Sequence, residues 1–271
     1  MNGYLAWSSQ FQSGVLPSID LALSIDCISW DEACGGSTGK AVKVAVIDSG
    51  IDATHPAIGN VDGYVAVESG PTGLVYTTQP HTDVYGHGTA CAGIIRAIAP
   101  ECELYSVRVL GPALITTGDI FIAGLRWAIE NGMHICNLSL GSTKKQYYAA
   151  LHELADIAFF RRIMLVVAAN NLPTPSFPSV YASVFSVAAH QDKEYDRYHY
   201  YYNPEPPIEF GAPGVDVRVP WLNHKWITIT GNSFAAPHIT GIVARIMGKH
   251  PYLTPFQLKV ILRSLAANAT R

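Results

Sequence analysis

Short apolar runs rich in β-branched residues alternate with helix-forming segments along this chain of 271 residues. The run 42–47 ends in Asp-Ser-Gly, which is typical of a buried strand followed by a turn. We expect further strands at 104–110, 135–140, 163–169 and 184–189, and helices at about 87–98, 118–131, 144–162, 233–249 and 254–267. This alternation predicts an α/β fold, with a central, mostly parallel β-sheet and helices on both faces.

The carboxyl ends of the strands are where such a sheet binds its ligands. Asp48 directly follows the first strand, and Ser139, Leu140 and Gly141 follow a later one. We therefore expect these two places to lie at the same edge of the sheet.

Composition narrows the class of protein further. Hydrophobic residues make up 49% of the chain, so a large core is expected. The net charge is -3, and no cluster of Lys and Arg indicates a nucleic-acid ligand. No apolar run is long enough to span a bilayer. Without repeats or linkers, 1–271 reads as a single domain, with 1–27 as an N-terminal extension. Nothing predicts the oligomeric state.

The five cysteines are odd in number and form no Cys-x-x-Cys pair, which argues against zinc and favours buried free thiols, although a bridge between Cys27 and Cys34 stays open. No basic residue precedes Lys40, so residues 1–39 lack the positively charged region with which a secretory signal begins. Both observations favour a cytoplasmic over a secreted location. A leader removed before residue 1 is the alternative.

Three segments carry residue types suited to peptide hydrolysis, which needs a nucleophile, a base and oxyanion donors. Asp48 ends a strand, His87 stands between two glycines at a helix start, and Ser233 begins an apolar helix. Each has a plain structural alternative as a capping residue. Pro237 is tolerated best in a first turn, so we expect its helix to begin close by.

Together these segments resemble the subtilase family, whose members share the order Asp, His, Ser. The resemblance covers roughly residues 28 to 265, and it implies that 1–271 is a single subtilisin-like catalytic domain with no recognisable pro-domain. It implies a serine endopeptidase in which Ser233 forms an acyl-enzyme, His87 is the base and Asp48 orients His87. No cofactor is implied. Ala57 stands where the family's strong calcium site has an Asp, so no metal is predicted there.

Further positions follow from the same resemblance. The stretch 165–171 implies Asn171 as the oxyanion donor, with Asn170 as the alternative. Cys91, one helical turn after His87, matches a thiol-dependent branch, so we expect mercurial reagents to inhibit.

A protein or peptide substrate is expected to bind as an extended strand. The pairing edges would be Leu114, Ile115 and Thr116 on one side and Ser139, Leu140 and Gly141 on the other. The S1 pocket would be walled by Ser139 to Gly141 with Ala168 and Ala169, and Ser176 near its floor. No carboxylate is placed for a basic P1 residue, so P1 is expected to be apolar or uncharged. Asp83 would favour a basic P2 residue.

Other functions remain open at this point. The Tyr-rich segment 191–207 reads either as an exposed loop with packed tyrosines or as a rim that contacts substrate. In the second case the chain could be a precursor-specific processing protease or a macrocyclase. An inactive subtilase-fold binding module is a further alternative. An α/β-hydrolase esterase is disfavoured, because Ser233 lacks a Gly-x-Ser-x-Gly elbow.

Overall fold

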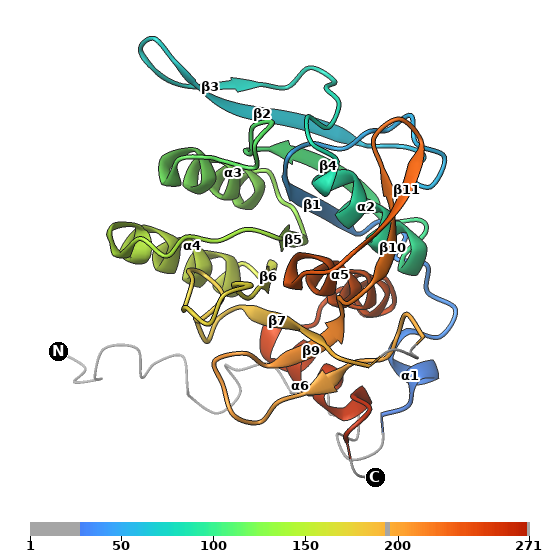
Figure 1. Ribbon diagram of the computed structural model, residues 1–271. Coiled ribbons are helices and arrows are strands. Elements are labelled where there is room, and N and C mark those ends of the chain that lie inside the picture. Colours follow the sequence, from blue (N-terminus) through green and yellow to red (C-terminus); the bar gives the residue numbers. More distant parts are fainter. Residues whose placement is uncertain (1–27, 193–195, 270–271) are drawn as a thin grey trace, which may run out of the picture.

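A nine-stranded sheet forms the centre of the computed structural model, which describes residues 28–192 and 196–269 (Figure 1). The strand order is β3-β2-β4-β1-β5-β6-β7-β9-β8. The seven strands from β2 to β9 in this spatial order pair in parallel with their neighbours. The two edge strands, β3 and β8, pair antiparallel with β2 and β9. The mostly parallel sheet expected from the sequence is thus confirmed.

The sheet strands are β1 (Lys43–Asp48), β2 (Gly63–Gly70), β3 (Gly73–Thr77), β4 (Glu103–Arg108), β5 (Ile135–Leu138), β6 (Met164–Ala168), β7 (Phe185–His190), β8 (Tyr201–Tyr202) and β9 (Phe210–Pro213). A separate hairpin consists of β10 (Val217–Trp221) and β11 (Lys225–Ile229). The helices are α1 (Trp30–Cys34), α2 (His87–Ile98), α3 (Gly118–Glu130), α4 (Tyr148–Phe160), α5 (Asn232–Lys249) and α6 (Pro255–Leu265), with a short 3-10 turn η3 (Lys145–Tyr147).

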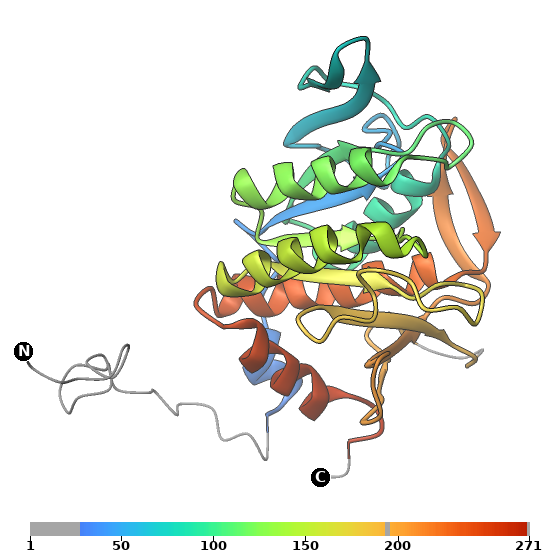
Figure 2. The same ribbon diagram turned by 90° about the vertical axis from the view of Figure 1, so that its left-hand side faces the viewer.

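Helices cover both faces of the sheet. Helices α3 and α4 lie on one face, toward the viewer in Figure 2, and α2 and α5 lie on the other. The central strand β1 explains the β-branched run in the sequence. Val44 and Val46 pack into the core beneath α2 and α5, whereas Ala45 and Ile47 pack beneath α3 and α4. A strand buried on both faces needs apolar side chains at every position.

Helix α5 begins five residues before Pro237, so the expectation that this proline lies in the first turn is wrong. Pro237 has no N–H to donate to the carbonyl of Ser233, four residues earlier. Two side chains donate to that carbonyl instead: Ser139 Oγ at 2.8 Å and Cys91 Sγ at 3.5 Å. The proline is therefore tolerated in the second turn.

The described part of the Tyr-rich segment packs on the side of α1 and α6. Tyr200 is buried and its hydroxyl donates to the Leu262 carbonyl, and the Tyr198 ring lies 5.9 Å from that of Trp30. These contacts agree with a loop of packed tyrosines. Residues 193–195 of this segment, like the extension 1–27, lie outside the described residues.

No helix in the described ranges combines the length and the apolar character needed to cross a membrane.

Candidate active site

Asp48 and His87 form a buried pair at the carboxyl end of β1. The Asp48 carboxylate is fully buried, and both of its oxygens lie 2.9 Å from His87 Nδ1. The Ser49 N–H also donates to it, at 2.7 Å. Because Nδ1 faces the carboxylate, Nε2 is the ring nitrogen left for exchanging protons with a substrate or a nucleophile.

Glycine is required on each side of His87 for a different structural reason. Gly86 has a φ of +116°, which favours glycine, and the Trp221 ring packs where a side chain would stand. A Cβ on Gly88 would lie 2.0 Å from the carbonyl oxygen of Gly50. The turn after β1 therefore approaches the start of α2 closely enough to bring Asp48 to His87.

The placement of Asp83 on the S2 side of the cleft is wrong. Its carboxylate is buried and accepts five hydrogen bonds: from Ser49 Oγ, from the N–H groups of Tyr85, Gly86 and Thr89, and from Thr89 Oγ1. An Asp before a glycine-rich helix start satisfies the free N–H groups there. Asp83 therefore holds the segment that carries His87, and it is not among the residues that line the cleft.

Opposing effects act on the pKa of His87. Burial is the largest and lowers it, but the charge of Asp48, the hydrogen bond to Asp48 and the charge of Asp83 together outweigh burial. The pKa of His87 is consequently raised above its ordinary value. The pair thus favours the imidazolium that forms when His87 accepts a proton.

Ser233 is the second residue of α5 and shares one cleft with His87. Its hydroxyl donates to the backbone carbonyl of Ser139 at 3.2 Å. Among the described residues this is the one hydrogen bond that the Ser233 side chain makes. A hydroxyl rotates freely to suit its partner, and contacts between catalytic groups often tighten only when substrate binds. The structure thus brings Ser233 and His87 to one cleft, with Asp48 buried behind His87.

A buried polar network supports the backbone at Ser233. Thr240 Oγ1 donates to Asn137 Oδ1, Asn137 Nδ2 donates to Ser139 Oγ, and Ser139 Oγ donates to the Ser233 carbonyl. All three supporting side chains are buried. Satisfied buried networks of this kind fix a single arrangement of the elements they join.

The two adjacent asparagines after β6 differ in their surroundings. Asn171 Oδ1 accepts the N–H of Asn232, which turns its amide toward the start of α5, and Asn171 lines the cleft beside Ser233. Asn170 Oδ1 instead accepts the N–H of Leu172 in its own turn. Asn232 Nδ2 donates to the carbonyls of Ala169 and Asn170. This side chain therefore connects the turn after β6 to the start of α5.

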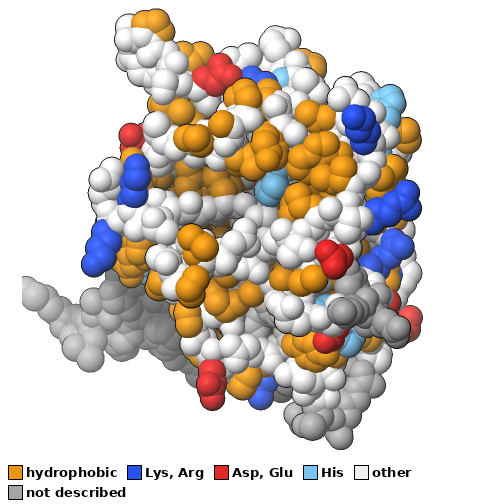
Figure 3. All heavy atoms as spheres, in the orientation of Figure 1, with side chains coloured by type: hydrophobic (Ala, Val, Ile, Leu, Met, Phe, Trp, Pro, Cys, Tyr) orange, Lys and Arg blue, Asp and Glu red, His pale blue; other side chains and the backbone are white. Residues whose placement is uncertain are grey.

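The cleft has a volume of about 560 Å³. The predicted edges line it: Leu114, Ile115 and Thr116 on one side, and Ser139, Leu140 and Gly141 on the other. Figure 3 shows hydrophobic side chains gathered between α3 and the β10–β11 hairpin on the face of Figure 1, with Lys, Arg, Asp and Glu mostly toward the periphery. Extended apolar chains suit such a surface.

A smaller hollow of about 150 Å³ adjoins Ser233 where the S1 pocket was expected. It is lined by Ser139, Leu140, Gly141, Thr143, Ala168, Ala169, Asn170, Asn171, Ser176 and Ser233. None of these residues is charged. Ser176 is buried, and its hydroxyl is bonded to that of Ser179.

Sequence reasoning missed an aromatic wall beside His87. Tyr85 and Trp221 line the cleft with their rings 5.7 Å apart, and the Phe234 ring lies 5.2 Å from that of His87. Trp221 ends β10, so its hairpin closes the side of the cleft away from the S1 hollow. Tyr85 could have been found from its place two residues before His87, but Trp221 is remote in sequence and carries no local signal.

Cys91 lies between Asp48, Ser139 and Ser233. Its Sγ is fully buried, 3.3 Å from Ser139 Oγ and 3.9 Å from Asp48 Oδ2. Burial and then the charge of Asp48 raise the pKa of this thiol well above its ordinary value, so it stays neutral. Cys91, Asp48 and His87 also offer ligand atoms within 4.8 Å of one another, which a soft metal ion could bridge.

Comparisons with known proteins agree with this geometry. The profile described as "Subtilase family" matches residues 39–271. Subtilisin Savinase of Lederbergia lenta is 34% identical over 86% of the chain and 86% of its own length. M-protease of Shouchella clausii is 34% identical over 85% of the chain, which spans only 60% of that relative. The solved structure of Sphericase superposes with a TM-score of 0.69 at 25% identity, covering 82% of this chain and 81% of its own.

An α/β sheet with an Asp–His pair and a helix-start serine at its carboxyl edge defines the class as serine hydrolases of the Asp, His, Ser order. The match over most of the chain then settles the family. The chain belongs to the subtilase family, the subtilisin-like serine proteases.

The expected cytoplasmic location is wrong. The relatives include the minor extracellular protease Epr of Bacillus subtilis, which is 34% identical over 84% of this chain. The match covers 35% of the length of Epr. The cysteine argument failed for a physical reason. Cys34, Cys91, Cys102 and Cys136 are free but buried, so they pack like small apolar residues and their number does not report the redox state outside the protein.

Proposed function

We propose that the chain is a serine endopeptidase that hydrolyses peptide bonds through Asp48, His87 and Ser233 and an acyl-enzyme intermediate. The observation that carries the proposal is the buried Asp48–His87 pair, which shares one cleft with Ser233 and Asn171. The aromatic wall beside His87 would receive the leaving-group side of the substrate. The S1 hollow and the two pairing edges would hold the acyl side.

The reaction starts when the Ser233 hydroxyl turns from the Ser139 carbonyl toward His87 Nε2 and attacks the scissile carbonyl. His87 takes the proton and passes it to the leaving amine, while Asp48 holds the ring and stabilises the imidazolium. The Asn171 amide and the Ser233 N–H at the start of α5 bind the oxyanion. Water then attacks the acyl-enzyme in the same way, with His87 as the base, and releases the acyl product and free Ser233.

Specificity at P1 should follow from the S1 hollow. Its small volume and uncharged lining favour small or apolar P1 side chains over Lys and Arg. A peptide library cleaved by the protein tests this, and strict cleavage after basic residues would contradict it.

The decisive experiment compares the wild type with Ser233→Ala on a denatured protein, with the cleavage sites mapped. Ser264→Ala on α6 is the matched control and should cleave like the wild type. We expect Ser233→Ala to lose both proteolysis and covalent labelling by a fluorophosphonate probe. Neither labelling nor cleavage by the wild type would instead favour the inactive binding module.

A macrocyclase of the same fold is the second candidate. Tyr198 packs on α1 and Tyr200 bonds to α6, and no described tyrosine of 196–202 lines the cleft, so the feature that favoured the macrocyclase lies away from it. Mass spectrometry of the products separates the two functions, because a cyclic product lacks the one water that hydrolysis adds to the linear product.

A further inference from the structure

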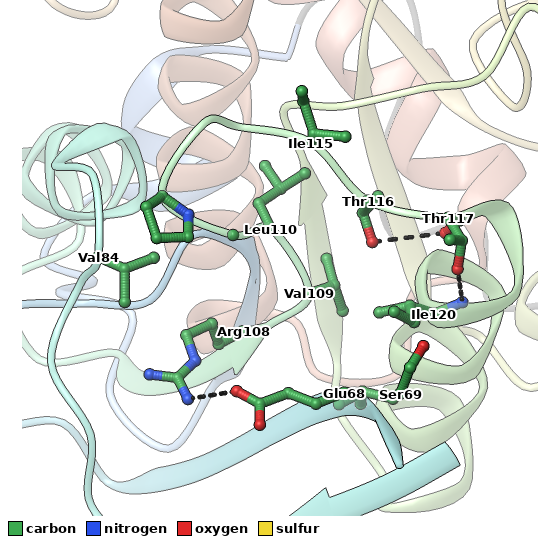
Figure 4. Close-up of a pocket in the computed structure, with 13 residues that line it drawn as sticks. Glu68, Ser69, Val84, Arg108, Val109, Leu110, Ile115, Thr116, Thr117 and Ile120 are labelled. Carbon is green, nitrogen blue, oxygen red and sulfur yellow. Dashed lines mark hydrogen bonds and ion pairs between the residues drawn. The ribbon is translucent and has the colours of Figure 1, made fainter. Parts of the chain in front are cut away.

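A second hollow, of about 510 Å³, lies on the far side of the substrate-pairing segment (Figure 4). We call it the arm pocket. It is lined by Val67, Glu68 and Ser69 of β2, by Val84, by Arg108 to Pro112 after β4, by Ile115 to Thr117, and by Ile120 of α3. Its volume is in the range of pockets that bind a ligand or several side chains.

The arm pocket and the cleft share a wall. Leu110, Ile115 and Thr116 line both. Between them the chain forms a narrow turn, closed by hydrogen bonds from the Gly111 N–H to the Ile115 carbonyl and from the Leu114 N–H to the Gly111 carbonyl. A substrate strand that pairs with 114–116 and continues past Thr116 therefore reaches the mouth of the arm pocket.

One edge of β2 is open toward this pocket. Strand β4 pairs with β2 only as far as Ala66 opposite Arg108, whereas β3 pairs with β2 as far as Gly70 opposite Gly73. In a two-residue hairpin the closing pair is hydrogen-bonded and the pairs alternate, so the N–H and C=O groups of Ser69 point away from β3. Among the described residues no strand takes up that edge beyond Ala66.

The chemistry of the arm pocket suits a polypeptide. Val67, Val109 and Leu110 give it buried apolar walls. At one end Arg108 Nη2 donates to Glu68 Oε1 at 2.8 Å, an ion pair without net charge, as Figure 4 shows. The guanidinium has further N–H groups that can donate to main-chain carbonyls.

We propose that the arm pocket is an extended substrate site. The acyl-side part of a long polypeptide substrate, beyond the residues held in the cleft, adds there as a strand on the open edge of β2. Main-chain hydrogen bonds to Ser69 hold it, and its side chains enter the apolar pocket. This inference rests on the proposed function, because it takes the cleft to be where the same chain is cleaved.

Two fluorogenic substrates test the proposal. They share the residues next to the cleaved bond, and one is extended on its acyl side by about six apolar and uncharged residues, enough to run from the cleft to β2 at about 3.3 Å per residue. We expect the extension to raise kcat/KM about ten-fold, mainly through KM. An equal kcat/KM for the two substrates would overturn the proposal.

Substitutions at Ser69 separate the site from the fold. Ser69→Pro removes an N–H that makes no bond to β3, and Ser69→Trp keeps the N–H but fills the pocket toward Ile120. Both should abolish the advantage of the long substrate and leave the short one unchanged, whereas Ser69→Ala should keep both. If Ser69→Pro fails to fold, Ser69→Trp still decides. A retained advantage in Ser69→Trp would refute the site, and no cleavage of the short substrate by wild type would refute the proposed function instead.

Discussion

The neighbouring amides Asn170 and Asn171 show how much depends on the position of a single side chain. Both follow β6, and sequence alone left the choice between them open. Of the two, only Asn171 has its oxygen engaged by Asn232 and lines the cleft beside Ser233. Asn170 is held within its own turn. The two substitutions should therefore differ in kind.

We expect Asn171→Ala to lower kcat by about 10²–10³-fold with little change in KM, the range known for the corresponding donor of subtilisin. The cause is loss of an interaction made only in the transition state. Asn170→Ala is the control and should keep most of its kcat. Steady-state kinetics on a short substrate measures both, and a larger loss in Asn170→Ala would reverse the assignment.

The pH dependence of the reaction should reflect the raised pKa of His87. Only the neutral imidazole can act as base, so kcat/KM must rise as pH increases through that pKa. Its midpoint should lie above the ordinary value of 6.5. Asp83→Asn removes one charge that raises the pKa, so its midpoint should fall. A midpoint below 6.5 in the wild type would contradict this account of the pair.

Cys91 predicts sensitivity to soft metals. A mercuric ion bound to its thiol would lie among the ligand atoms of Asp48 and His87 and displace the imidazole. Mercuric chloride should abolish activity in the wild type and in Cys102→Ser, but not in Cys91→Ser. Iodoacetamide, which needs an accessible thiolate, should have little effect.

At the scale of elements, the sequence predicts what is buried and local. Strands β1, β4, β5, β6 and β7 and helices α2, α3, α5 and α6 lie within a few residues of the predicted ranges, because their apolar periodicity reflects contact with the core. Strands β2, β3, β8, β9, β10 and β11 were not predicted. The residues of β3 and β11 are largely exposed and show no such pattern, and β8 and β9 are only two and four residues long. The cleft edges and S1 lining were predicted through family resemblance. Asp83 was misplaced because burial cannot be read from an isolated acidic residue.

The approach of β1 to α2 gives a prediction at this scale. Gly88→Ala would press a methyl group against the Gly50 carbonyl and separate Asp48 from His87. We expect a loss of about 1–3 kcal/mol in the free energy of unfolding, the usual cost of overpacking, together with low activity. Gly211→Ala in β9 is the control, because its Cβ would meet nothing closer than 3.8 Å. Urea denaturation measures both variants.

At the scale of the whole molecule, two apolar cores on opposite faces of one sheet stabilise the fold. The four described cysteines are buried free thiols and contribute as packing residues. Stability should therefore be independent of redox state. We expect the Tm to be the same with and without a reducing agent, measured by calorimetry. A fall in Tm on reduction would reveal a covalent link that this account lacks.

Pro237 has a consequence for anyone who redesigns the primary specificity of this enzyme. The proline leaves the Ser233 carbonyl dependent on two side-chain donors, of which the Ser139 hydroxyl is the nearer and also borders the S1 hollow. A combinatorial library that varies position 139 alone should return mostly serine and threonine. Allowing alanine at position 237 restores the helical donor, so the two positions are expected to co-vary among active clones.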